Sequence, residues 1–190
     1  MNSFKMLLLA GAAASLGACM TMDGQAATSA DVVTVGGAPM YANKTIVENA
    51  VNSADHTTLV AAVKAAGLVD TLNGAGPFTV FAPTNAAFAA LPAGTVDTLL
   101  RPENKAMLTS VLTYHVVPGR LTAADLMSQI RAGGGMAMLT TVQGGMLHAR
   151  MDGNRIVIVD AKGGVATVTQ ADVLQSNGVI HVTNKVSLPG

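Results

Sequence analysis

Cysteine is nearly absent from this chain: Cys19 is the only one in 190 residues. A disulfide within one chain is therefore excluded, and the fold must be held together by packing alone. Tryptophan is absent, aromatic residues make up 3% of the sequence, and charged residues make up 12%, about half the usual charged share. With so few aromatic side chains, the core must be built mainly from Val, Leu, Ile, Ala and Met.

Charge of either sign is scarce and evenly balanced. Eleven Lys and Arg stand against eleven Asp and Glu, and no basic patch interrupts the sequence. This balance excludes strong electrostatic steering of a ligand and argues against a nucleic-acid partner.

Catalytic signatures are missing as well. The sequence has no Gly-x-Ser-x-Gly elbow, no His-Glu-x-x-His helix and no Cys-x-x-Cys pair. Gly74-Ala75-Gly76 precedes a predicted strand and lacks the third glycine of a dinucleotide-binding loop. We therefore predict that the protein is not an enzyme and holds neither a cofactor nor a metal ion.

The N-terminal residues are typical of an export signal. Lys5 and a short apolar run predict a signal peptide over residues 1–18, and the run is too short to span a bilayer. The sequence from Leu16 to Cys19 resembles a bacterial lipobox, which predicts lipidation of Cys19 and a flexible tether over residues 19–43. Because Met20 follows the cysteine, this resemblance implies an outer-membrane lipoprotein. The alternative is ordinary cleavage near Ala27, which would release a secreted or periplasmic soluble protein.

Residues 44–190 are predicted to form one domain. Helical periodicity dominates its first half and strand patterns dominate its second half, which favours the α+β class. The expected helices cover residues 46–50, 56–66 between Asp55 and Gly67, 85–91, 95–100, 103–113, and 123–131 behind Thr122. The expected strands cover residues 78–82, 138–142, 146–151, 156–159, 165–169 and 179–186.

Residues 76–88 hold three of the four Phe residues of the chain. The pattern predicts a strand over 78–82, which Pro83 ends because it cannot donate to a ladder. Thr84 or Asn85 can then cap a helix that carries Phe88. This concentration of aromatic bulk predicts a core segment.

Three segments together resemble the fasciclin-type domain: residues 76–88, residues 114–119 (Tyr-His-Val-Val-Pro-Gly) and residues 177–189. The resemblance covers about residues 44 to 189. It implies a wedge of about seven β-strands with several helices packed on it, in which the first and third segments pair. One departure is Thr183-Asn184, where the family commonly has an apolar residue followed by Asp, so a charge-dependent role at Asn184 is in doubt.

The resemblance also implies a function. The family is one of non-enzymatic extracellular adhesion and binding modules; some members bind partner proteins through the Tyr-His region, and some bind apolar ligands such as carotenoids. We therefore predict a lipid-anchored module that binds a protein or matrix partner through Tyr114 and His115. The residue itself favours a second interpretation of Tyr114, a position at the edge of the core with its hydroxyl satisfied. For His115 and His181, we favour burial with backbone hydrogen bonds over a metal site, because two His do not complete zinc coordination.

Methionine is unusually frequent, with 11 residues in the chain. Flexible Met side chains fill irregular cores, which is the role we favour here, and they also line adaptable binding surfaces. The second role predicts an apolar-ligand surface formed by Met136, Met138, Met146 and Met151. The protein would then carry or scavenge an apolar small molecule, which is the alternative function.

Overall fold

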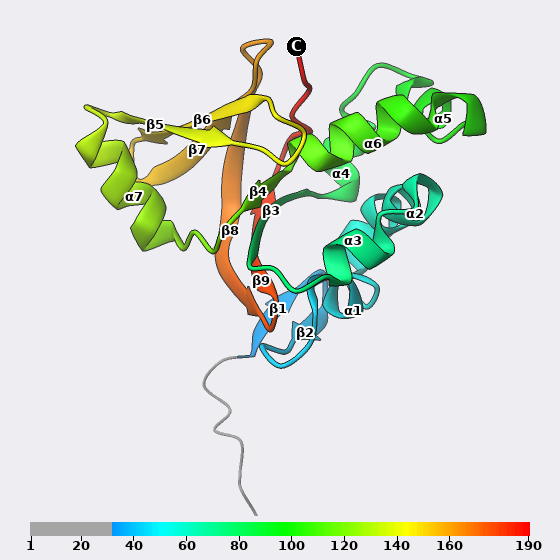
Figure 1. Ribbon diagram of the computed structural model, residues 1–190, viewed down its shortest axis with the longest axis horizontal. Coiled ribbons are helices and arrows are strands. Elements are labelled where there is room, and N and C mark those ends of the chain that lie inside the picture. The colour runs from blue at the N-terminus through cyan, green and yellow to red at the C-terminus, as the bar shows by residue number, and fades with distance from the viewer. Residues whose placement is uncertain (1–31) are drawn as a thin grey trace, which may run out of the picture.

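The computed structural model describes residues 32–190 of the chain (Figure 1). Its centre is a seven-stranded sheet with the strand order β4-β3-β9-β8-β7-β6-β5. The strands are β3 (Phe78–Pro83), β4 (Val116–Pro118), β5 (Met136–Thr140), β6 (Met146–Asp152), β7 (Arg155–Val159), β8 (Val165–Gln175) and β9 (Gly178–Thr183). The predicted signal peptide of residues 1–18 and the predicted lipid site Cys19 lie outside the described residues.

Two neighbouring strands of the sheet, β3 and β9, come from segments that are far apart in the sequence. β3 and β9 run parallel, with Phe81 opposite His181, whereas the other neighbouring strands are antiparallel. The Val142 N–H donates to the Val116 carbonyl at 2.8 Å, so the two outer strands approach each other and the sheet is nearly closed. The predicted α+β wedge and the pairing of its first and third segments are confirmed.

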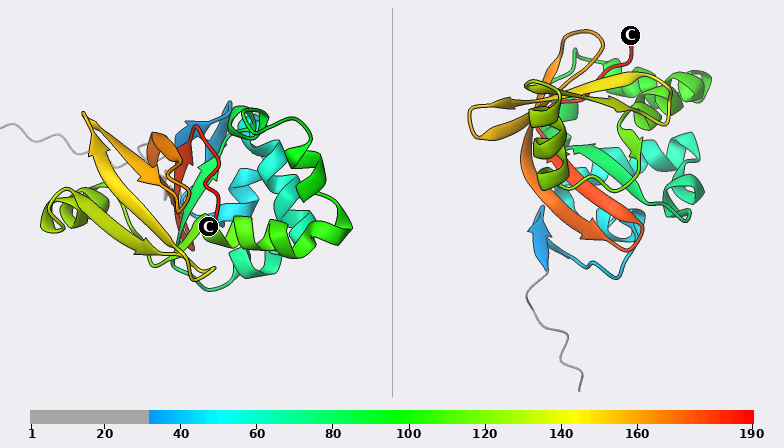
Figure 2. Two further views of the ribbon diagram at one scale, coloured as in Figure 1. Left: turned by 90° about the horizontal axis from the view of Figure 1, so that it is seen from above. Right: turned by 60° about the vertical axis from the view of Figure 1, so that its left-hand side comes forward.

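Most helices lie on one side of the sheet, and α7 lies apart from them beside β5 and β6 (Figure 2). Thr84 caps α4 and Thr122 caps α7, as the sequence predicts, and Gly67 ends α2 with a φ of 73°. Asp55 is not a cap; it lies in a short 3₁₀ turn that precedes α2. The helices are α1 (Ile46–Ala50), α2 (Thr57–Ala66), α3 (Val69–Asn73), α4 (Asn85–Ala89), α5 (Thr95–Leu99), α6 (Lys105–Tyr114) and α7 (Ala123–Ala132), with 3₁₀ turns η1 (Ala54–His56) and η2 (Pro102–Asn104).

The central strands separate two hydrophobic cores because successive side chains point to opposite faces. Val80 and Ala82 of β3 face the first core, which α1–α6 cover. Phe81 faces the second core, which lies inside the wedge beneath α7, and its ring stacks on His181 with centroids 5.6 Å apart. All six residues of β9 are buried. The predicted core role of residues 76–88 therefore rests on burial of this segment on both faces.

The domain begins earlier than the sequence predicts. Residues 33–40, expected to belong to the tether, form a hairpin of β1 (Val33–Val35) and β2 (Ala38–Met40). Val35 and Met40 are buried in the first core. The turn is Gly36-Gly37, and both glycines have positive φ, which a side chain would strain. The tether prediction is therefore wrong from residue 33 onward, because this hairpin covers core surface that would otherwise face water.

Candidate functional site

Tyr114 ends α6, and its side chain is 1% exposed. Its hydroxyl donates to the Met146 carbonyl at 2.6 Å and accepts from the Ala161 N–H at 3.0 Å. Burial raises the pKa of the Tyr114 phenol, so the hydroxyl stays protonated and remains a donor. Tyr114 thus ties α6 to the β5–β6 hairpin and to the loop after β7.

His115 follows directly and is 3% exposed. The Ser187 N–H donates to its Nε2 at 2.9 Å, so Nδ1 carries the proton and donates to the Val111 carbonyl at 2.7 Å. Burial lowers the pKa of His115. The prediction that Tyr114 and His115 form a partner-binding edge is therefore corrected: both side chains lie in the interior and present no exposed edge.

His181 uses its ring in the same way. The Asp172 N–H donates to Nδ1 at 3.3 Å, and Nε2–H donates to the Leu121 carbonyl at 2.8 Å. Burial lowers the pKa of His181 as well. Both nitrogens of His115 and of His181 therefore have backbone partners, which agrees with the structural role favoured from the sequence.

The four predicted methionines divide between the two faces of the β5–β6 hairpin. Met136, Met138 and Met146 lie on its outer face and are 46%, 66% and 49% exposed. Met151 lies on the inner face, half-buried against the second core. The favoured core role is wrong for the first three, because Ala137, Leu139 and Leu147 fill the core positions between them.

An apolar groove lies elsewhere, between α1–α3, α6 and strands β3 and β4. It encloses about 50 Å³, and its walls are almost entirely apolar. Val47, Val60 and Leu68 are half-buried in its lining, and Lys64 is an exposed member of it. Sequence reasoning missed this groove because each wall segment, taken alone, has the pattern of an ordinary core-facing helix or strand.

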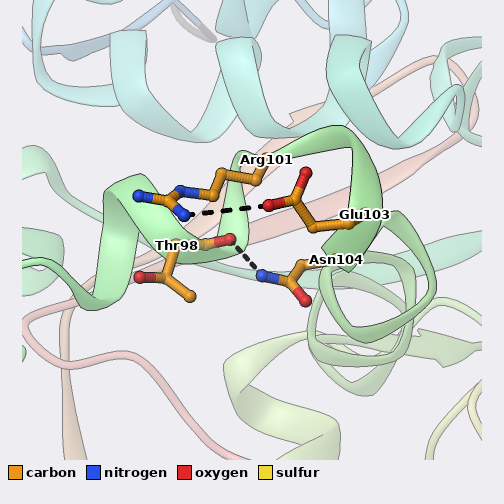
Figure 3. A network of polar contacts seen from close by, with 4 residues as sticks. All are labelled: Thr98, Arg101, Glu103 and Asn104. Carbon is orange, nitrogen blue, oxygen red and sulfur yellow. Dashed lines mark hydrogen bonds and ion pairs between the residues drawn. The ribbon is translucent and has the colours of Figure 1, made fainter.

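Charged contacts contribute little to the surface. Within residues 32–190, one ion pair forms, between Arg101 Nη1 and Glu103 Oε1 at 3.7 Å (Figure 3). The Asn104 side chain beside it donates to the Thr98 carbonyl at 2.7 Å. An exposed pair of this kind adds roughly 0–1 kcal/mol, so it contributes little to stability and marks no site.

Two features are absent from residues 32–190. No group of three or more His, Cys, Asp or Glu side chains is placed to hold a metal ion. No helix there is both long and apolar enough to cross a membrane.

The Thr183-Asn184 departure has a local explanation. Asn184 Oδ1 accepts from the Thr167 N–H at 2.8 Å, and the Asn184 N–H donates to the Thr167 carbonyl at 3.2 Å. The position requires an acceptor oxygen, which an amide supplies as well as a carboxylate does. This contact therefore needs no charge.

The geometry defines an α+β wedge that presents an apolar groove and a Met-bearing sheet face. The Fasciclin domain model matches residues 54–189, and the chain belongs to the fasciclin family. It is 52% identical to Protein sll1483 of a Synechocystis strain over 76% of this chain and 73% of that protein. It is 39% identical to Immunogenic protein MPB70 of Mycobacterium bovis over 73% of this chain and 65% of that protein.

The fold also has a solved counterpart. A FAS1 domain pair from the insect cell adhesion molecule fasciclin I aligns with a TM-score of 0.68 and 20% identity. The alignment covers 75% of this chain and 50% of that one. At this identity the likeness establishes the fold alone.

Proposed function

We propose that the protein is a non-enzymatic extracytoplasmic module that binds a protein or matrix partner and is held at the outer membrane by lipid on Cys19. Support comes from the family and from the fold shared with domains of a cell adhesion molecule. The observation that carries the proposal is the groove between α1–α3 and α6, because it combines apolar walls with an opening to solvent. The groove replaces the exposed edge expected from Tyr114 and His115 as the contact site, and of these two residues only His115 borders it.

The size of the groove favours a partner side chain as its occupant. Its volume is about 50 Å³, and in the same measure a single water needs roughly 10–15 Å³. The groove therefore accepts a few heavy atoms, such as the tip of one aliphatic or aromatic side chain. Anchors of this kind, seated in desolvated pockets, supply most of the energy of many interfaces.

Val47→Trp tests this site. Val47 is half-buried in the groove lining, whereas Val51, one turn further along, is exposed and lies outside it. We expect Val47→Trp to abolish attachment of cells that depend on this protein and Val51→Trp to leave attachment unchanged, with both variants equally stable in urea. Equal attachment by the two variants would contradict the groove as the contact site.

The alternative function, carriage of an apolar small molecule, would use the same groove because its walls offer almost no polar contact. A molecule of carotenoid size exceeds this volume, so the helices would have to separate to admit it. Purification from the native host followed by solvent extraction distinguishes the two functions. One pigment or lipid molecule per chain would establish the carrier function. An extract without pigment or lipid would support the function of binding a protein or matrix partner.

The anchor is tested separately. We expect the parent protein to fractionate with outer membranes and Cys19→Ala to appear in the soluble fraction or as an unprocessed precursor. Ser15→Ala, a change within the predicted signal peptide that spares the lipobox, serves as the control. Membrane partition of Cys19→Ala equal to that of the parent would refute lipid anchoring.

A further inference from the structure

The outer face of the β5–β6 hairpin gathers three thioethers and one imidazole. Met138 of β5 lies directly opposite His148 of β6, and Thr140 lies opposite Met146. The strict alternation of both strands puts Met136, Met138, Met146 and His148 on this face, while Leu139 and Leu147 point inward. The inner face packs against α7, so the outer face is the one that remains open (Figure 1).

The spacing places these four side chains within reach of one ion. Cβ atoms of directly opposite residues in an antiparallel pair are about 4.5–5.5 Å apart, and diagonal neighbours are about 7–8 Å apart. His148 is opposite Met138, diagonal to Met136 and two residues from Met146. Each Met side chain has three rotatable bonds, and these three are exposed, so their sulfur atoms can turn toward the imidazole without disturbing the core.

His148 differs from the histidines that hold the fold together. Its Nδ1 is buried and has no hydrogen-bond partner. The nitrogens of His115 and His181, in contrast, are all bonded to the backbone. The ring of His148 therefore has a nitrogen that folding does not use, on a residue that shares its sheet face with the three methionines.

The donor set selects the kind of ion. Ca²⁺ and Mg²⁺ require several oxygen ligands, and no carboxylate stands opposite the three methionines, whose partners are Arg150, His148 and Thr140. Zn²⁺ in proteins is bound by thiolate, imidazole and carboxylate rather than by thioether. Thioethers are soft ligands that select Cu(I). The positive charge of Arg150 on the same face further favours a monovalent ion over a divalent one.

We propose that Met136, Met138, Met146 and His148 form a binding site for one soft monovalent cation, Cu(I) or its analogue Ag(I), on the outer face of β5–β6. The site gives the exposed methionines a role that neither the core nor the groove requires. It shares no residue with the groove of the proposed function, so each can fail independently of the other.

Silver titration of the full chain tests the site. All proteins carry Cys19→Ala, because a free thiol would otherwise bind Ag(I), and their methionine methyl groups are labelled with ¹³C for NMR. We expect the methyl resonances of Met136, Met138 and Met146 and the imidazole of His148 to shift together and to saturate at one equivalent of Ag(I). The methyl of Met107, exposed on α6, should not move before that point.

Ligand variants make the test quantitative. Competition for Cu(I) with a coloured chelator should show binding at least about tenfold weaker in Met138→Leu and in His148→Gln, since loss of even an outer-sphere partner has an effect of that size. Met107→Leu is the matched control and should bind like the parent. Equal affinity of Met138→Leu and Met107→Leu, saturation well below one equivalent, or equally tight binding of Zn²⁺ would each overturn the proposal.

Discussion

Tyr114→Phe removes one hydroxyl and keeps the ring, so it isolates the role that the structure gives to this side chain. The hydroxyl donates a hydrogen bond to the Met146 carbonyl and accepts one from the Ala161 N–H, and these groups lie 32 and 47 residues away in the sequence. Each hydrogen bond contributes about 1 kcal/mol net, so losing both should lower the free energy of unfolding by about 2 kcal/mol. For a domain of this size that loss corresponds to a decrease in Tm of about 4–8 °C.

Tyr41, the other tyrosine of the chain, provides the control for Tyr114→Phe. Tyr41 is 40% exposed, and its ring lies beneath the Lys44 ammonium at 5.0 Å, a contact that phenylalanine retains. Tyr41→Phe should therefore change stability by less than about 0.5 kcal/mol. Urea unfolding followed by far-ultraviolet circular dichroism compares the two variants. If Tyr114→Phe is as stable as Tyr41→Phe, the structural role is refuted, and a loss of partner binding without loss of stability would reinstate the binding edge.

Three other changes probe the centre of the fold. Phe81→Ala should lower the unfolding free energy measured in urea by about 3–5 kcal/mol, since the ring is fully buried. A loss below about 1 kcal/mol would contradict the core role of residues 76–88. Gly178→Ala should lower the unfolding free energy by at least about 1–3 kcal/mol in the same assay, because a methyl group there would clash with the Phe78 carbonyl oxygen. An unchanged urea midpoint would contradict the close pairing of β3 and β9. Burial lowers the pKa of His115 and His181 below 6.5, so the unfolded chain binds more protons below that pH. The two neutral rings therefore contribute fully to the unfolding free energy above pH 6.5, and this contribution falls as the pH drops, by up to about 1.4 kcal/mol per pH unit for each ring. Equal urea midpoints at about pH 7.5 and about pH 5.5 would contradict the loss of stability at low pH.

The pairing of β3 with β9 was implied by the family resemblance, and the residues support the burial of both strands because each carries apolar side chains on both faces. Phe81 and Val80 cannot both be buried unless the sheet is covered on two sides, and the same holds for Val179 and Ile180. The N-terminal hairpin was predictable in principle as well. Its signal, Gly36-Gly37 between alternating apolar residues, was present in the sequence but lay in a segment whose composition suggested a tether.

The orientation of β5 is ambiguous in its own sequence. Met136, Ala137, Met138 and Leu139 give both faces of the strand apolar side chains, so alternation alone does not decide which face is buried. The neighbouring strand resolves the question, because His148 and Arg150 share a face with Met146 and turn that face toward solvent. The polarity of β6 was therefore the signal that would have placed the methionines outside.

The hydrogen-bond partners of Tyr114 and His115 could not be predicted from local sequence. Their polar atoms mark them as candidates for contact with a partner, and nothing nearby in the chain supplies all their hydrogen-bond partners. Those partners include Ala161 and Ser187, which are 47 and 72 residues away. Only the closed fold brings these backbone groups to the two rings, so burial could be favoured from the sequence while the groups that satisfy the two rings could not be named.

Binding capacity in this domain must lie where burial is incomplete. The segments that identify the family are largely buried, and where they line the groove, as Phe78 and His115 do, they form part of its wall. Burial is incomplete in the groove between α1–α3 and α6 and on the outer face of β5–β6. They share no residue, and their chemistries differ, since one offers aliphatic walls and the other offers thioethers. Val47→Trp should therefore leave Ag(I) binding unchanged, and Met138→Leu should leave attachment unchanged, so a variant that impairs both would show that the two surfaces are coupled through the fold.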